Sequence, residues 1–254
     1  MRAALILLLV CSEAAAQDSA PDTSLLPQAR PTEAGSPALA DPEDREEEVA
    51  PDAEDATEPP VRETLREDDA DFAACLSRLD GFGTVYQERE AILDPDDGDC
   101  GILRPVEVTE VVPGLSLRPD AVMRCETAAA LAEWVSGSVQ PAADLIESYG
   151  AVTGIEHGST YICRRRNNAA EGKLSEHSFG NAVDVMAFLF ENGERIPIEP
   201  RADSGTIEEA FQRAVRGAAC LSFTTVLGPG TDATHEDHLH MDVKARRGGY
   251  RICQ

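Results

Sequence analysis

The spacing of apolar residues predicts helices and strands in the part of the chain after residue 70. In four segments, apolar residues return every third or fourth position, which is typical of a helix packed on one side. These segments are 71–79, 121–136, 141–149 and 206–221. Alternating or β-branched apolar runs are typical of strands. They cover 150–165 around a turn at 156–159, then 182–190, 196–198, 224–227 and 238–243. The order of these elements predicts an α+β domain over 71–254, with a small, mainly antiparallel sheet and flanking helices.

Residues 1–16 have the pattern of a secretory signal peptide. Met1-Arg2 is followed by an apolar run over 3–10 and by the small residues Ala14–Ala16, after which cleavage is expected. The apolar run is shorter than the roughly 20 residues that span a bilayer, so we expect no transmembrane anchor in the mature chain. Cys11 leaves a lipoprotein as an alternative, although Val10 is bulky for the position before a lipidated cysteine. We therefore expect export across the inner membrane to the periplasm or cell envelope.

Residues 17–70 differ from the rest of the chain in composition. They are rich in Pro, Ala, Glu and Asp, contain no aromatic residue, and carry about half of the formal net charge of −25. A segment with so little apolar surface cannot offset the entropy lost on ordering, so a disordered acidic linker is expected here. A specific acidic binding tail is the alternative. The acidity argues against a nucleic-acid partner, because proteins that bind nucleic acids present a basic face.

The cysteines indicate an oxidising compartment. Those that remain after removal of the expected signal peptide are Cys75, Cys100, Cys125, Cys163, Cys220 and Cys253. An even number in an exported chain indicates a set of disulfides, here three, whose pairing the sequence leaves open. A thiolate metal site is disfavoured because no Cys-x-x-Cys pair occurs. We expect a disulfide-stabilised domain whose chemistry uses histidine and aspartate.

Four of the five histidines lie in two short blocks, 175–184 and 235–242, and they make up the candidate site together with an aspartate. The candidates are His177, Asp184, His235, His238 and His240. Two imidazoles and one carboxylate suit a zinc-like divalent ion and leave a fourth position open, as in a catalytic site. Because alternate residues of a strand share a face, neighbouring strands would aim Asp184 and His240 at one point. An interruption of regular structure at residues 178–180 would fold His177 back toward that point. The small side chains of Gly180 and Ala182 would leave room for the ion and its substrate.

Two sets of motifs resemble known families. Ser175-x-His177-x-x-Gly180-x-Ala182-x-Asp184 followed by His238-x-His240 resembles the signature of the LAS metallopeptidases. That group includes D-alanyl-D-alanine carboxypeptidases and dipeptidases, a murein endopeptidase and the zinc domain of hedgehog proteins. A wider set, over about Cys75–Cys253, resembles the extensin-like C-terminal domain family of bacterial exported proteins. Its motifs are Tyr161-x-Cys163-Arg164-x-Arg166-Asn167, Cys220-x-x-Phe223 and Leu227-Gly-Pro229.

The LAS resemblance implies a LAS/hedgehog-like zinc-peptidase fold and assigns roles to the candidate residues. The implied Zn2+ ligands are His177, Asp184 and His240, and His238 would lie beside the metal. The general base stays open between Asp237, three residues before the last ligand, and His235, five residues before it. Arg164 and Arg166 are the candidates for stabilising an oxyanion or binding a substrate carboxylate.

The resemblance and the export signal together favour an exported zinc-dependent metallopeptidase that acts on peptide stems or crosslinks of bacterial peptidoglycan. Two alternatives remain open at this point. One is a non-catalytic zinc-binding domain of the cell envelope on the same fold. The other is a disulfide-stabilised envelope protein whose His/Asp cluster binds no metal. The sequence indicates no oligomeric state.

Overall fold

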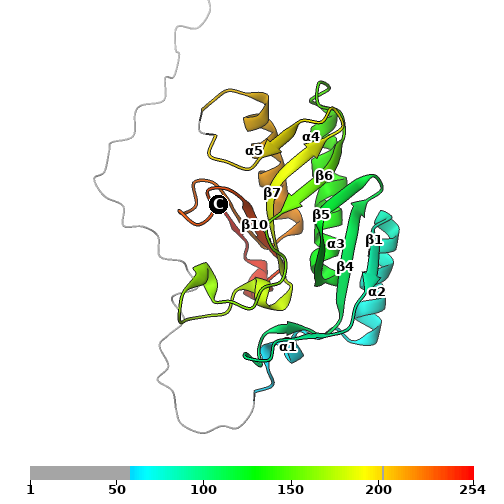
Figure 1. The fold of residues 1–254 in the computed structure, drawn as a ribbon, viewed down its shortest axis with the longest axis vertical. Coiled ribbons are helices and arrows are strands. Elements are labelled where there is room, and N and C mark those ends of the chain that lie inside the picture. Colours follow the sequence, from blue (N-terminus) through cyan, green and yellow to red (C-terminus); the bar gives the residue numbers. More distant parts are fainter. Residues whose placement is uncertain (1–57, 202) are drawn as a thin grey trace, which may run out of the picture. The chain divides into compact units, whose positions relative to one another are not determined.

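The structure, a computed structural model, describes residues 58–201 and 203–254 (Figure 1). The expected signal peptide, and the expected linker up to residue 57, lie outside the described residues. Ordered structure precedes the expected domain boundary at residue 71, because α1 (Val61–Thr64) and the start of α2 (Asp69–Phe82) come before it. Between these helices, Glu67 is buried in an ion pair with Arg124, at 2.6 Å. The last part of the expected linker therefore belongs to the folded domain.

The described residues contain a nine-stranded sheet in the order β1-β4-β5-β6-β7-β10-β9-β11, with β8 also pairing with β7. Its strands are β1 (Val85–Glu88), β4 (Pro105–Val112), β5 (Leu115–Arg124), β6 (Val152–His157), β7 (Ala182–Phe190), β8 (Arg195–Pro197), β9 (Thr225–Leu227), β10 (Leu239–Asp242) and β11 (Ile252–Cys253). Neighbouring strands are antiparallel except β5–β6 and β9–β11. A two-stranded sheet pairs β2 (Ile92–Leu93) with β3 (Gly101–Ile102). The predicted mixture of helices with a mainly antiparallel sheet is confirmed, but the predicted small size of the sheet is wrong.

The error in size comes from the block of β1, β4 and β5, which the sequence analysis did not predict. The helix expected over 121–136 begins only at α3 (Cys125–Trp134), because the residues before Cys125 complete β5. The helix then continues through a π-helical turn (Val135–Val139) into α4 (Gln140–Asp144), so the helix expected over 141–149 ends early. Of the strand structure expected over 150–165, only β6 forms.

The strands that carry Asp184 and His240, and the helix between them, agree with the predictions. β7 has the predicted bounds, β8 overlaps the strand predicted over 196–198 and pairs with β7 as a hairpin, and β9 and β10 lie within the predicted strands. α5 (Ile207–Ser222) begins where expected because the Thr206 Oγ1 accepts a hydrogen bond from the Glu209 N–H, at 3.2 Å. This bond satisfies one of the free N–H groups of the first helical turn.

Helices α2, α3 and α5 lie along one face of the sheet, with α3 in the middle (Figure 1). The hydrophobic core fills the space between these helices and the strands. Trp134 of α3 contacts Phe188 of β7, and Phe188 contacts Phe211 of α5, with ring centroids 5.8 and 5.2 Å apart. The Trp134 Nε1–H donates to the Val215 carbonyl at 2.8 Å, so the buried indole keeps a partner for its one donor. In the part of the chain that the structure describes, no helix is long and apolar enough to cross a membrane.

Strand β7 changes the face that it turns to the core part-way along its length. Val183 and Val185 belong to the core, and so do Phe188 and Phe190, although strict alternation would put the two pairs on opposite faces. The pairing with β6 shifts beside Met186, so that β7 contributes one extra residue there. Such a bulge redirects the side chains on one side of it. β7 can therefore bury its valines and phenylalanines and still direct Asp184 to the face opposite the helices.

Three disulfides join segments that are distant in sequence, as the cysteine count predicted. Cys75–Cys125 joins α2 to the start of α3, and Cys220–Cys253 joins α5 to β11. Cys100–Cys163 joins the loop before β3 to the segment that leads to the first histidine block. Each bond closes a long loop, which restricts the unfolded chain and so stabilises the fold.

Candidate metal centre

A short capped turn brings His177 to the sheet. The 3₁₀ helix η4 (Glu176–Phe179) begins at Ser175, whose Oγ accepts a hydrogen bond from the His177 N–H at 3.4 Å. It ends at Gly180, which has a left-handed φ of 67°. The Gly180 carbonyl accepts a hydrogen bond from the Thr127 Oγ1 of α3, at 2.8 Å. The turn is thus closed at both ends and fixed to the helix layer, and the predicted fold-back of His177 is confirmed.

Strands β7 and β10 place the other two members of the cluster side by side. Asp184 and His240 are directly opposite one another in the antiparallel pair, so their side chains leave the same face. The His177 Nε2 lies 3.0 Å from the Asp184 Oδ1 and 3.1 Å from the His240 Nδ1. The third side of this triangle, from the His240 Nδ1 to the Asp184 Oδ1, measures 3.0 Å. The expected convergence of the three residues is therefore present in the structure.

The three donor atoms fit a zinc-sized ion. Two imidazole nitrogens and one carboxylate oxygen bind zinc at about 2.0–2.2 Å, and ligands around a tetrahedral ion at that distance lie roughly 3.3 Å from one another. The separations of 3.0–3.1 Å in the cluster are close to this value. A second grouping in the described chain, of Asp97 with Cys100 and Cys163, does not offer thiolates, because its two cysteines form a disulfide.

The ring nitrogens that face away from this triangle have partners of their own. The His240 Nε2 donates to the Asp242 carboxylate at 3.2 Å, and that carboxylate also accepts from the Thr225 Oγ1 at 2.7 Å. The His177 Nδ1 lies 3.0 Å from the Ser159 hydroxyl. Outer hydrogen bonds of this kind fix the orientation of a histidine and leave the inner nitrogen free to bind a metal.

Acids and histidines balance one another's charge inside the cluster. Burial raises the pKa of Asp184, but hydrogen bonds from His177 and His240 outweigh burial and hold the pKa well below its usual range. Burial lowers the pKa of His240, but hydrogen bonds to Asp184 and Asp242 outweigh it and raise the pKa to about 9. Without a metal, His240 is therefore a cation at neutral pH. A metal ion that binds here must displace this proton.

The remaining histidines of the second block lie next to the cluster. The ring of His235 packs against those of His238 and His240, with centroids 5.2 and 5.8 Å apart. Burial, only partly opposed by Asp232, lowers the pKa of His235. The His238 Nε2 lies 3.7 Å from the Asp184 Oδ1. The side chain of Asp237, the other candidate base, is 76% exposed and its carboxylate accepts from the His238 Nδ1, at 2.9 Å.

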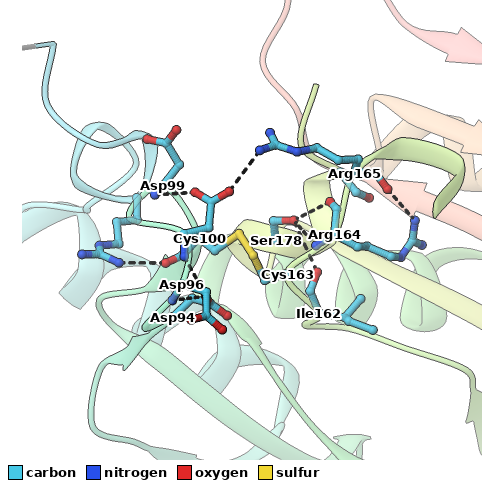
Figure 2. The surroundings of a disulfide bond; sticks show 12 residues. Asp94, Asp96, Asp99, Cys100, Ile162, Cys163, Arg164, Arg165 and Ser178 are labelled. Carbon is cyan, nitrogen blue, oxygen red and sulfur yellow. Dashed lines mark hydrogen bonds and ion pairs between the residues drawn. A yellow bond between two sulfur atoms is a disulfide. The ribbon is translucent and has the colours of Figure 1, made fainter. Parts of the chain in front are cut away.

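Arg164 lies on the segment that braces His177, where the Ile162 N–H donates to the His177 carbonyl at 3.2 Å. Figure 2 shows the contacts of Arg164 with Ser178, the residue after His177. Its backbone N–H donates to the Ser178 Oγ at 3.1 Å, and the same hydroxyl donates to the Arg164 carbonyl at 2.9 Å. The Arg164 guanidinium donates to the Arg165 carbonyl at 3.4 Å. The neighbouring Cys163 is joined to Cys100, so the disulfide holds this bracing segment. The contacts of Arg164 next to His177 are therefore made by its backbone, and its guanidinium bonds to the Arg165 carbonyl.

Arg166, the other candidate arginine, begins the 3₁₀ helix η3 (Arg166–Asn168). Its backbone N–H donates to the Lys173 carbonyl at 3.1 Å, and this bond closes the loop between Cys163 and the first histidine block. An isolated bridge between Arg165 and Leu174 lies at the same place. Arg166 is half-buried in this loop.

The expected reason for the small size of Gly180 is wrong. A Cβ built on Gly180 would lie 2.3 Å from the Ile102 Cδ1 and 3.1 Å from the Arg124 N. The space beside Gly180 is therefore filled by buried Ile102 and by backbone, and the glycine serves close packing and a left-handed turn. Ala182 is likewise fully buried. Gly180 therefore leaves no room for an ion or substrate, whereas for Ala182 that expectation stays a prediction.

The sequence analysis did not assign Ser159, Asp232 or Asp242 to the site, although all three contact the histidines of the two blocks. Asp242 lies two residues after His240, so strand alternation placed both on one face and signalled the contact. Asp232 precedes His235 by three residues, a spacing that permits a turn. Nothing in the local sequence marks Ser159. It reaches His177 because the Asp184 N–H donates to the Ser159 carbonyl at 3.0 Å.

Comparison with known proteins agrees with the wider set of motifs. A family model described as "Extensin-like protein C-terminus" matches residues 73–254. The chain belongs to this family. The extensin-like region contains nearly all of α2, the whole nine-stranded sheet, the three disulfides and the His/Asp cluster. No curated protein and no solved structure matched the chain.

Proposed function

We propose that this extensin-like protein is an exported zinc-dependent metallopeptidase with a LAS-type fold, which cuts peptide stems or crosslinks of bacterial peptidoglycan. The observation that carries the proposal is the triangle of the His177 Nε2, the Asp184 Oδ1 and the His240 Nδ1, with sides of 3.0–3.1 Å. Two neutral imidazoles and one carboxylate would leave a divalent ion with a net positive charge. They would also leave one coordination position open for water or substrate, as hydrolysis requires.

When bound, a zinc ion would supply Lewis acidity at a scissile carbonyl and lower the pKa of water to about 7. His235 is the proposed general base, because its ring lies against His238 and His240 whereas Asp237 is turned to solvent. The low pKa of His235 keeps the ring neutral and able to accept a proton near pH 7. His238 is the proposed stabiliser of a developing oxyanion, because its Nε2 lies beside the cluster, 3.7 Å from the Asp184 Oδ1, while Asp237 contacts its Nδ1.

The substrate class rests on three further considerations. The motif resembles that of peptidases that act on peptidoglycan peptides. The disulfides support an oxidising compartment, in which the cell wall lies. The net charge of −25 does not favour an anionic polymer such as a nucleic acid. For Arg164 and Arg166, a role at an oxyanion or a substrate carboxylate stays a prediction from the resemblance.

The test is zinc content together with digestion of purified peptidoglycan sacculi, followed by product masses. We expect one equivalent of zinc and new muropeptides, with both lost after chelation and in His240→Ala. His157→Gln is the matched control, because His157 is the one histidine outside the two blocks and donates from Nε2 to the Pro119 carbonyl, at 2.8 Å. If zinc binds but no products form, the peptidase proposal is refuted in favour of a non-catalytic zinc-binding domain. No zinc at all would overturn both.

A further inference from the structure

The carboxylate of Asp232 is built into the turn that leads to His235. Its Oδ1 accepts hydrogen bonds from the Thr234 N–H at 2.7 Å, the Thr234 hydroxyl at 2.6 Å and the His235 Nδ1 at 2.8 Å. The His235 N–H also donates to the Asp232 carbonyl, at 3.3 Å. These bonds within four consecutive residues fix one oxygen of Asp232 beside one nitrogen of His235.

The hydrogen bonds decide which nitrogen of His235 carries the proton. The Thr234 hydroxyl gives its only proton to Asp232, so towards the His235 Nδ1, at 3.1 Å, it can act only as an acceptor. The other neighbour of the Nδ1 is an ionised carboxylate, which also accepts only. Two acceptors require a donor between them, so the proton lies on Nδ1. The Nε2 of a neutral His235 then keeps its lone pair.

We propose that Asp232 is a positioning residue that holds His235 in the Nδ1–H tautomer, with Nε2 as the nitrogen that accepts the proton in the proposed hydrolysis. The inference rests on the proposed function for that last step only. Asp232 itself touches no reacting atom and acts through His235. The side chain of Asp232 is 44% exposed and that of His235 is 11% exposed, so the pair links solvent to the edge of the cluster.

The role of Asp232 differs from that of Asp237. Both carboxylates accept from a Nδ1 of the second block, Asp232 from His235 and Asp237 from His238. Thr234 holds Asp232 with two further hydrogen bonds. Asp237 lies next to its histidine on a side chain that is 76% exposed. A substitution of Asp237 is therefore the matched control for one of Asp232.

The experiment is imidazole nitrogen NMR on the full chain with ¹⁵N-labelled histidine, at pH 8, with and without one equivalent of zinc. Only five histidines have to be assigned. We expect the wild-type His235 to show a protonated Nδ1 and an unprotonated Nε2. Asp232→Ala should shift His235 toward the Nε2–H form that free histidine prefers in water. Asp232→Asn should keep the Nδ1–H form, because the two Thr234 donors hold the amide oxygen in place of the carboxylate. Asp237→Ala should leave the His235 signals unchanged.

An Nε2–H tautomer of His235 in the wild type, or an unchanged tautomer in Asp232→Ala, would overturn the proposal. If Asp232→Ala does not fold, the wild-type spectrum alone can still overturn the proposal by showing the Nε2–H form. In the sacculus assay, Asp232→Ala should lower kcat by roughly 10–100-fold with little change in KM or zinc content, and Asp232→Asn should restore most of the activity. The spectra report the tautomer whether or not any peptide is cut, so failure of the peptidase proposal is distinguishable from failure of this one.

Discussion

Replacing Gly180 by alanine tests whether close packing positions the first metal-binding candidate. Gly180 ends the turn that carries His177 and has a φ of 67°. A left-handed conformation costs an L-residue about 1–2 kcal/mol. The new Cβ would also lie 2.3 Å from the Ile102 Cδ1 and 2.9 Å from the Ile102 Cγ1. Ile102 is 1% exposed, so it can move only against packed neighbours. Overpacking of a core costs about 1–3 kcal/mol, so we expect Gly180→Ala to lower the free energy of unfolding by about 2–5 kcal/mol.

Gly193→Ala is the control for the conformational part of this cost. Gly193 has a φ of 87°, but nothing lies within 4 Å of a Cβ built there. We therefore expect a loss of only about 1–2 kcal/mol. Urea denaturation of the metal-free proteins measures both losses, and zinc titration should show weaker binding for Gly180→Ala alone because the turn sets the position of His177. Equal losses in the two variants would refute the packing argument.

Three further substitutions or conditions have expected outcomes. For the metal-free protein, the raised pKa of His240, about 9, means that the stability due to its proton is complete below about pH 6.5 and is lost as the pH rises through 9. Urea denaturation at pH 6 and pH 10 should show this fall without zinc and not with it. Glu67→Ala removes one partner of a buried ion pair with Arg124 and should cost about 3–5 kcal/mol. Asp69→Ala removes a fully exposed carboxylate beside Arg104 and should lower stability much less than Glu67→Ala. Serine at both Cys100 and Cys163 and serine at both Cys220 and Cys253 should each cost about 4 kcal/mol. Zinc titration should show weaker binding only for the first pair, since Cys163 lies on the segment that braces His177.

Much of the second half of the fold followed from local capping and turn residues. α5 and the β7–β8 hairpin have clear capping or turn residues and formed where expected. β5 was not predicted. Proline is unfavourable in a central strand, and the residues from 121 on were predicted as a helix. In the structure, β5 pairs with β6 only over Ser116–Arg118, and its pairing with β4 is interrupted before Ala121. Pro119 therefore sits where no ladder bond is needed, a fact that depends on the neighbouring strands.

The convergence of the cluster was predictable where it depends on strand alternation, as for Asp184 and His240. The bulge beside Met186 was not, because strict alternation would carry the face of Asp184 on to Phe188 and Phe190. A bulge depends on how two strands pair, and β6 lies far from β7 in the sequence. Ser159 could not be predicted for the same reason. It follows β6 and contacts His177 only through the pairing of strands in the folded sheet.

The arrangement of the outer hydrogen bonds explains why the cluster favours a cation over a simple network of paired side chains. His177, His235, His238 and His240 each have an oxygen partner on one ring nitrogen. In His177 and His240, the other nitrogen meets its counterpart at 3.1 Å, with the Asp184 Oδ1 at 3.0 Å from both. A single proton cannot bridge three such atoms, whereas one divalent ion can bind all three lone pairs. Asp184 and Asp242 add two negative charges in a largely buried place, so a positive charge is needed whether or not a metal is bound. The proton on His240 supplies that charge at neutral pH. A divalent metal ion that displaced it would supply a larger positive charge and could bind all three converging atoms at once.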